Sequence, residues 1–150
     1  MIVMALLITG FAQAQKLKES EIPKAVKDSF AKRFPNTKEV EWSKESDTEF
    51  EAEFETAKKE QSANFDLSGK WMGTETEINK SELPKAVIDA IAKEFAGFKI
   101  EEAEKAEILD KGMFYEVELE KGKLSYEVQF SAEGKVLKKE EKKEKDEDKD

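Results

Sequence analysis

Two stretches of the chain repeat one pattern of apolar positions, and each predicts a helix of about three turns. "EIPKAVKDSFAKRFP" (residues 21–35) returns as "ELPKAVIDAIAKEFA" (residues 82–96), with nine of the fifteen positions identical. Large apolar residues recur in both at every fourth position, which places them on one face of a helix. They are Ile22, Val26, Phe30 and Phe34 in the first stretch and Leu83, Val87, Ile91 and Phe95 in the second.

The ends of both predicted helices carry typical boundary residues. Pro23 and Pro84 stand at the start, where the N–H that proline lacks would have no partner within the helix. Pro35-Asn36 and Ala96-Gly97 stand at the other end, where proline, asparagine and glycine stop a helix. The two helices are therefore predicted to have the same length.

Behind each helix the apolar period changes from four to two, which predicts strands. Apolar residues alternate with glutamate in "FEAEFE" (residues 50–55) and again in "YEVELE" (residues 115–120). Gly69, Gly122 and Gly134 mark tight turns between strands. Further short strands are predicted at residues 40–42, 63–67, 71–78, 126–130 and 136–141.

Each unit is thus one helix followed by about four antiparallel strands. A helix with one apolar stripe and a sheet with one apolar face must cover each other. Two such units side by side can share one sheet. We therefore predict an α+β fold, with a tandem repeat (residues 20–79 and 81–137) forming one extended antiparallel sheet and two helices on one face. The opposite face should carry the glutamates.

Both ends of the chain differ in composition from the middle. Residues 1–14 are uncharged and end in Ala-x-Ala after an apolar run, which predicts a signal peptide, although no Lys or Arg precedes Lys16. A buried N-terminal strand or helix is the alternative. Residues 138–150 contain only lysines and acids, which predicts a flexible tail that extends the last strand by a few residues at most. Residues 15–137 would then form the folded domain of a periplasmic or secreted protein.

The composition of the chain excludes several classes of function. The net charge of −9 argues against nucleic acid, whose phosphates need a basic surface. The chain has no His and no Cys, so serine–histidine and cysteine–histidine catalysis and imidazole-ligated metal sites are excluded. Ser29 and Lys32 have the spacing of some acyl-transfer enzymes but lack the accompanying motifs. We therefore predict a protein that is not an enzyme and has no cofactor, no metal and no membrane insertion after signal cleavage.

The order of these segments resembles a known family. "IP..V...F..RFP....VEW", "FEAEF", "NFDLSGKW", "ELPKAV", "YEVEL" and "VQFSAEGKVL" follow one another as in the exported PepSY-like, β-lactamase-inhibitor-like (BLIP-like) proteins of Bacteroidetes-type bacteria. The resemblance covers residues 20–138. It implies a tandem helix-plus-four-strand fold, a periplasmic or secreted location, no catalysis, and an exposed sheet face that in the inhibitor relatives docks onto an enzyme.

Strand alternation selects the residues of that face. Glu51, Glu53, Glu116 and Glu118 point outward, and Phe114 is the one outward aromatic that the alternation allows. We predict that these five bind an unidentified protein, such as a periplasmic hydrolase or protease, with electrostatic steering. Two alternatives stay open. The glutamates could only keep the sheet soluble, or the protein could be an acidic cation-binding or envelope-stress protein without a fixed protein partner. The oligomeric state is not predicted.

Overall fold

The computed structural model describes residues 15–142, which form one antiparallel sheet and two helices. The nine strands lie in the sheet in the order in which they follow in the chain. The α+β class, the single antiparallel sheet and the two helices are therefore confirmed. The strands are β1 (Gln15–Leu17), β2 (Val40–Ser46), β3 (Glu49–Thr56), β4 (Lys59–Asp66), β5 (Trp71–Glu77), β6 (Lys99–Ile108), β7 (Gly112–Lys121), β8 (Leu124–Phe130) and β9 (Val136–Lys142). The helices are α1 (Lys24–Arg33) and α2 (Lys85–Glu94), each preceded by a short 3-10 turn.

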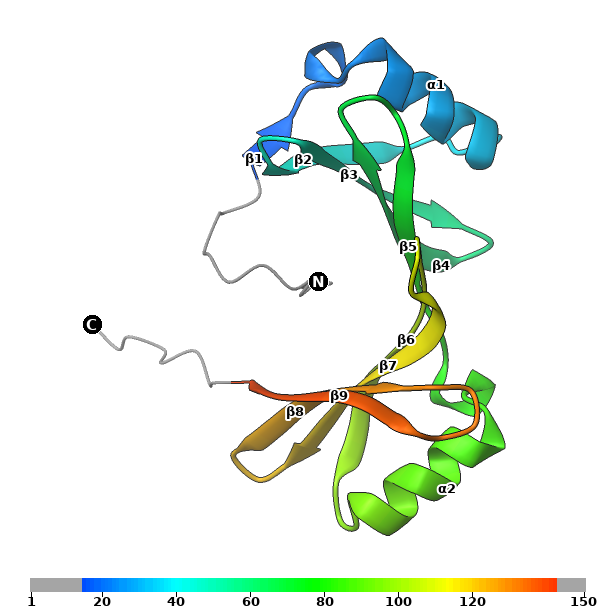
Figure 1. Cartoon of the computed structure of the whole chain (residues 1–150), viewed down its shortest axis with the longest axis vertical. Coiled ribbons are helices and arrows are strands. Elements are labelled where there is room, and N and C mark those ends of the chain that lie inside the picture. The colour runs from blue at the N-terminus through cyan, green and yellow to red at the C-terminus, as the bar shows by residue number, and fades with distance from the viewer. Residues whose placement is uncertain (1–14, 143–150) are drawn as a thin grey trace, which may run out of the picture.

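The sheet bends into a crescent, with both helices on its convex side (Figure 1). The face that carries no helix is concave, and we call it the concave face. In the middle of the crescent β5 pairs with β6, from Gly73 opposite Ile108 to Glu77 opposite Glu104. This pairing joins an N-terminal half, formed by α1 and β1–β5, to a C-terminal half, formed by α2 and β6–β9.

Both helices begin directly after their proline and end shortly before a residue with positive φ. The carbonyl oxygen of Pro23 accepts the first hydrogen bonds of α1, from the N–H of Val26 at 3.0 Å and of Lys27 at 3.1 Å. Beyond the C-terminal ends, Asn36 has a φ of 69° and Gly97 a φ of 84°. Asparagine and glycine enter this left-handed region at the lowest cost, so the predicted helix ends are confirmed.

The apolar core is divided into two clusters, one under each helix. In the N-terminal half the ring of Phe30 packs against those of Phe34, Trp42, Phe54 and Phe65, with centroids 5.0–6.3 Å apart. The buried residues of the C-terminal half are mostly aliphatic: Leu83, Val87, Ile91, Phe95, Ala103, Val117, Leu119, Val128 and Phe130. The sheet is continuous as predicted, but the apolar core is not.

The break in the core lies at β5, where the helix-side positions are polar. Thr74 and Thr76 alternate with the concave-face residues of this strand and accept hydrogen bonds of 2.8 Å from Trp71 Nε1 and Gln61 Nε2. The guanidinium of Arg33 stacks on the Trp71 ring at 3.7 Å from its centroid. No helix covers the middle of the sheet (Figure 1), so no apolar stripe is available there. These polar contacts lie between the two apolar clusters instead.

The turn before β5 and the turn before β9 each pack against the first turn of a helix. A Cβ atom at Gly69 would lie 2.4 Å from the Ala25 carbonyl oxygen, and one at Gly134 would lie 2.3 Å from that of Ala86. Both glycines also have positive φ, 83° and 81°. The close contact with the helix carbonyl oxygen and the positive φ angle therefore both require glycine at these turns.

Several features at the ends of the chain differ from expectation or lie outside the described residues. β1 was not predicted, because three residues are too few to show an alternation. β9 continues to Lys142, so residues 138–142 of the expected tail pair with β8. The predicted signal peptide lies outside the described residues. In residues 15–142, neither helix has the length and apolar character needed to cross a bilayer.

Candidate functional site: the acidic concave face

All five predicted site residues lie on the concave face. Their neighbours along β3 and β7, such as Ala52 and Val117, belong to the cores on the other side. The structure does not bring the five together: Glu51 and Glu53 lie on β3, the other three on β7, and three strands separate them.

The accessibility of these residues differs from expectation. Glu53 is exposed, and Glu116 and Glu118 are partly buried. Glu51 is only 3% exposed and Phe114 only 7%, although both were predicted to be accessible to a partner. The physical reason is curvature, since side chains on the inside of a bent sheet converge and cover one another. Phe114 therefore offers little surface as an aromatic anchor.

Other strands add carboxylates that the sequence prediction missed. Glu75 on β5 is 8% exposed and Glu127 on β8 is 9% exposed, and both lie on the concave face. Glu104 on β6 pairs in register with Glu116. Glu127 stands between Tyr126 and Val128 in the same alternation that identified Glu116, so this signal could have found it. Nothing in the local pattern indicated that these groups would be buried.

In the N-terminal half, Glu51 has an oxygen without a partner. Glu51 Oε2 is buried and receives no hydrogen bond. Its cross-strand neighbours are Ser43 on β2 and Asn64 on β4. Ser43 Oγ donates to Glu45 at 3.3 Å, and Asn64 Nδ2 donates to Glu49 at 3.0 Å. Both neighbours donate to other carboxylates, and Glu51 Oε2 has no partner within residues 15–142, which is rare for a buried polar group.

Burial and crowding favour the protonated form of two carboxyls in this region. Desolvation, followed by the charges of Glu45 and Glu53, raises the pKa of Glu51 to about 8. Desolvation, followed by the charge of Glu104, raises the pKa of Glu75 to about 8. Among residues 15–142 no salt bridge reaches Glu51, Glu53 or Glu75, so no nearby cation opposes these shifts.

In the C-terminal half, by contrast, the carboxylates have partners within the chain. Lys142 Nζ lies 2.6 Å from Glu118 Oε2, and Ser125 Oγ donates to Glu118 Oε1 at 3.1 Å. Gln129 Nε2 donates to Glu116 at 2.9 Å. The space that remains is small, a depression of about 20 Å³ lined by Glu102, Glu104, Glu116, Glu118, Glu127 and Lys142.

Lys142 moderates the titration of this second group. Desolvation, followed by the charge of Glu116, raises the pKa of Glu104 to about 7, and the same two causes raise that of Glu127 to about 7. The positive charge of Lys142 lowers both values. Burial alone would lower the pKa of Lys142, but its hydrogen bond to Glu118 and the surrounding charges raise it. The ammonium therefore remains charged.

An open groove of about 670 Å³ lies beside Glu53. Its lining is dominated by carboxylates, with one lysine, Lys16, whose Nζ is 2.8 Å from Glu41 Oε2. The acids that line it are Glu39, Glu41, Glu53, Glu55 and Glu60. Such a groove presents a negative potential to an approaching partner.

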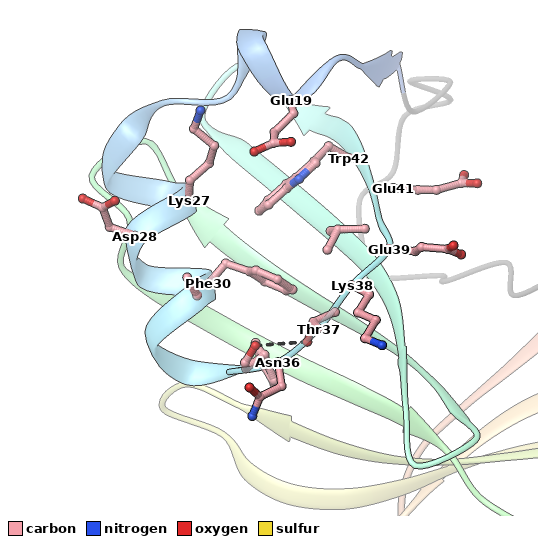
Figure 2. Close-up of a pocket in the computed structure, with 13 residues that line it drawn as sticks. Glu19, Lys27, Asp28, Phe30, Asn36, Thr37, Lys38, Glu39, Glu41 and Trp42 are labelled. Atoms are coloured by element: carbon pink, nitrogen blue, oxygen red, sulfur yellow. Dashed lines mark hydrogen bonds between the residues drawn. The ribbon is translucent and has the colours of Figure 1, made fainter.

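A second groove, of about 700 Å³, lies between α1 and β2. Figure 2 shows Phe30 and Trp42 pointing into it, whereas Glu39 and Glu41 point away from the helix. Both aromatics are about 6% exposed, so the floor is closed core. On the wall, Thr37 Oγ1 donates to the Phe34 carbonyl oxygen at 3.0 Å. The rim carries both charge signs, from Glu19, Lys27, Asp28 and Lys38, and presents no single chemistry to a ligand.

No metal-binding arrangement is found within the described part of the chain. In residues 15–142, no three acidic side chains converge in a way that could hold a metal ion. The acidic character of the concave face is therefore spread over many strands.

The fold and this face define a class of small α+β proteins in which one curved sheet carries two helices on its convex side and leaves its concave face free. The particular family follows from comparison with known proteins. The family model described as "Putative beta-lactamase-inhibitor-like, PepSY-like" matches residues 11–62 and 48–138. The chain belongs to this family. No curated protein shows significant similarity to it.

Solved structures from Bacteroides share the fold. A BLIP-like protein from Bacteroides fragilis is 24% identical, with a TM-score of 0.72 over 83% of this chain and 90% of that protein. A DUF2874 family protein from Bacteroides uniformis is 20% identical, with a TM-score of 0.74 over 79% of this chain and 88% of that one. A protein from Bacteroides eggerthii, described as one of the "putative periplasmic proteins", has the same values.

Proposed function

We propose that this chain is a non-enzymatic, periplasmic or secreted protein-binding module that acts through its concave face. The observation that carries the proposal is the unsatisfied, buried carboxylate oxygen of Glu51 within an acidic face that no other part of residues 15–142 covers. A buried acceptor without a donor is costly in the isolated chain. A partner that supplied the donor would remove this cost.

Charge and shape both favour a basic protein surface as the ligand. The concave face gathers glutamates from β2 to β8, and few lysines in residues 15–142 neutralise them. Such a face raises the association rate of a positively charged partner and does so less at high salt. The inhibitor-like description of the family supports an enzyme as partner, and we propose a periplasmic hydrolase or protease whose activity the module regulates by occlusion.

A matched pair of charge reversals tests this function. One variant carries Glu53→Lys and Glu116→Lys, one change in each half of the concave face. The control carries Asp28→Lys and Glu94→Lys, one exposed change on each helix with the same total charge change. Each immobilised protein is exposed to periplasmic proteins from a Bacteroides species. We expect the wild type and the control to retain the same protein at low salt, and the concave-face variant to lose it.

The retained protein is then assayed for hydrolase or protease activity, which we expect to fall on addition of the module at equal concentration. Retention by all three proteins alike, or by none, would contradict binding through the concave face. Calorimetric titration with calcium tests the alternative that the protein binds cations and has no fixed protein partner. Saturable calcium binding that is lost when Glu51 and Glu116 are changed to Gln would favour a cation-handling protein instead.

We also propose that the two halves are copies of one unit. Supporting this, residues 21–35 and 82–96 share a sequence pattern, and each is followed by strands and a glycine turn that returns to the same helix. The glycines at these turns approach equivalent alanines, Ala25 and Ala86, at nearly the same distance. Matched substitutions at the two turns, described in the Discussion, test this equivalence.

A further inference from the structure

The neighbourhood of Glu51 indicates what kind of side chain a partner would insert. We infer that Glu51 is the receptor for a guanidinium group, so that the protein bound to the concave face places an arginine side chain between β2 and β4. This inference rests on the proposed protein-binding function and gives the chemistry of the contact.

The first argument is the direction of the missing hydrogen bond. Glu51 Oε2 has no hydrogen-bond partner although the side chain is only 3% exposed, and once Glu51 is ionised this oxygen is an acceptor. Its cross-strand neighbours Ser43 and Asn64 donate to Glu45 and Glu49 instead. No group within residues 15–142 makes this hydrogen bond, so the oxygen is open to a donor from a ligand, and an ionised carboxylate binds a charged donor more strongly than a neutral one.

The second argument selects arginine over lysine. Several carboxyls surround Glu51, so an inserted side chain meets more than one acceptor at once. A guanidinium presents five donors in a planar fork and stays charged when buried. A lysine ammonium presents three donors, is strongly hydrated and loses its proton more readily on burial. The groove of about 670 Å³ gives a route, because Glu53 lines it and lies two residues from Glu51 on the same face of β3.

Binding should also expel a proton. The groups that face Glu51 are Ser43 and Glu45 from β2, Glu49 and Glu53 from β3, Ser62 and Asn64 from β4, and Glu75 from β5. None of them is cationic, so Glu51 holds a proton near neutral pH. A guanidinium favours the carboxylate, and the proton passes to the buffer. The pKa of Glu51 is therefore expected to fall when the arginine binds.

Titration of the full chain, with ¹³C-labelled glutamate, tests this inference by NMR. The probes are three blocked tripeptides, Gly-Arg-Gly, Gly-Lys-Gly and Gly-citrulline-Gly, the last having the shape of arginine without its charge. We expect the arginine peptide to shift the Glu51 carboxyl signal saturably and to lower its titration midpoint. The lysine peptide should bind more weakly, and the citrulline peptide should cause no comparable shift.

Two substitutions localise the effect. Glu51→Gln should weaken binding of the arginine peptide on the order of tenfold, the loss expected for a charge-assisted hydrogen bond. Glu120→Gln, an exposed position on the concave face of β7, should leave the affinity within about twofold. The fall in the Glu51 midpoint needs no variant, so it remains decisive if Glu51→Gln fails to fold.

Equal responses to arginine and citrulline, equal affinity for arginine and lysine, or unchanged affinity in Glu51→Gln would each overturn the inference. The outcome is separable from that of the proposed function. If the Glu51→Gln variant still retained the partner protein but the Glu53→Lys, Glu116→Lys variant did not, the proposed function would stand and the arginine site would be contradicted. If the arginine peptide bound but no protein was retained, the arginine site would stand and the proposed function would be contradicted.

Discussion

The two halves of this protein each pack one helix on part of the same sheet, but their concave-face carboxylates differ in how they are paired. In the C-terminal half, Glu118 is held by Lys142 at 2.6 Å and by Ser125 at 3.1 Å. In the N-terminal half, Glu51 has a buried oxygen without a partner, and none of the salt bridges within residues 15–142 reaches it. One half therefore pairs Glu116 and Glu118 with partners in the chain, and the other leaves Glu51 Oε2 without one.

The helix-side cores differ as well. The N-terminal core is built from interlocking aromatic rings around Phe30, and Ile91 takes the corresponding place in a largely aliphatic C-terminal core. Both solutions cover the sheet under a helix of ten residues. The comparison shows that the packing of a helix on the sheet depends on the spacing of the apolar residues. The charged groups on the concave face can differ between the halves without changing that packing. The following predictions test this contrast, beginning with the largest expected effect.

Truncation of the central helix residue in each half should destabilise the protein most. We expect Phe30→Ala to lower the free energy of unfolding by about 3–5 kcal/mol and Ile91→Ala by about 2–5 kcal/mol, because both leave cavities in close-packed cores. Urea unfolding followed by fluorescence measures both. Ile88→Ala, at a position 37% exposed on α2, should cost much less. A smaller loss for Phe30→Ala than for Ile91→Ala would contradict the central role of the aromatic cluster.

Alanine at the glycine turns should strain both halves equally. Gly69→Ala and Gly134→Ala each combine positive φ with a Cβ less than 2.5 Å from a helix carbonyl oxygen. We expect each to cost roughly 2–4 kcal/mol in unfolding free energy. Gly112→Ala, with a φ of 79° and no atom within 4 Å of the new Cβ, should cost only about 1–2 kcal/mol. Clearly unequal losses at Gly69 and Gly134 would count against equivalent halves.

Stability should fall as the pH rises from about 5 to about 8. The pKa values of Glu51 and Glu75 are about 8 in the folded chain, against 4.5 for an unperturbed glutamate. Between these values the folded chain binds more protons than the unfolded chain, so the free energy of unfolding decreases with pH. The slope is at most about 1.4 kcal/mol per pH unit for each such carboxyl.

Urea unfolding at pH 5.5, 6.5 and 7.5 measures this dependence. Glu51→Gln and Glu75→Gln should each flatten the decline, because a neutral amide has no proton to lose. Glu55→Gln serves as the exposed control and should leave the slope as it is in the wild type. A stability that rises over this pH range would show that these carboxyls are ionised in the folded chain.

Removal of the internal cation should make the C-terminal half resemble the N-terminal half. In Lys142→Met we expect the pKa values of Glu104 and Glu127 to rise, because the charge of Lys142 lowers both. The loss in unfolding free energy should be no more than about 1 kcal/mol. NMR titration of the glutamate carboxyls measures the shifts. Lys16→Met, which removes the exposed partner of Glu41, should leave Glu104 and Glu127 unchanged.

Much of the fold could be predicted because its signals are local. Recurrence at every fourth residue located α1 and α2, and alternation of apolar residues with glutamate assigned Glu51, Glu53, Glu116 and Glu118 to the concave face. The strand β6 was not predicted, since "KIEEAEKAEI" contains few large apolar residues. The strand predicted at residues 63–67 was placed one residue too far: β4 ends at Asp66, and Leu67 is 50% exposed in the turn.

The candidate site was predictable only as a face. Strand alternation could not show that Glu51 and Phe114 would be buried, or that Glu75 would join the acidic surface, although it could have placed Glu127 there. It also could not show that Lys142, 24 residues from Glu118 in the chain, would neutralise one half only. These properties depend on how neighbouring strands are curved and registered.

The amino-acid sequence by itself determined the two helices, most of the strands and which side of those strands faces the core, because these follow from the spacing of apolar residues along a short segment. Only the tertiary structure decided which carboxylates are shielded, which are paired and which keep a proton. The exposure and the pKa of each concave-face carboxyl depend on side chains from several strands that the curvature of the sheet brings together. The sequence of any one strand does not show which side chains these are.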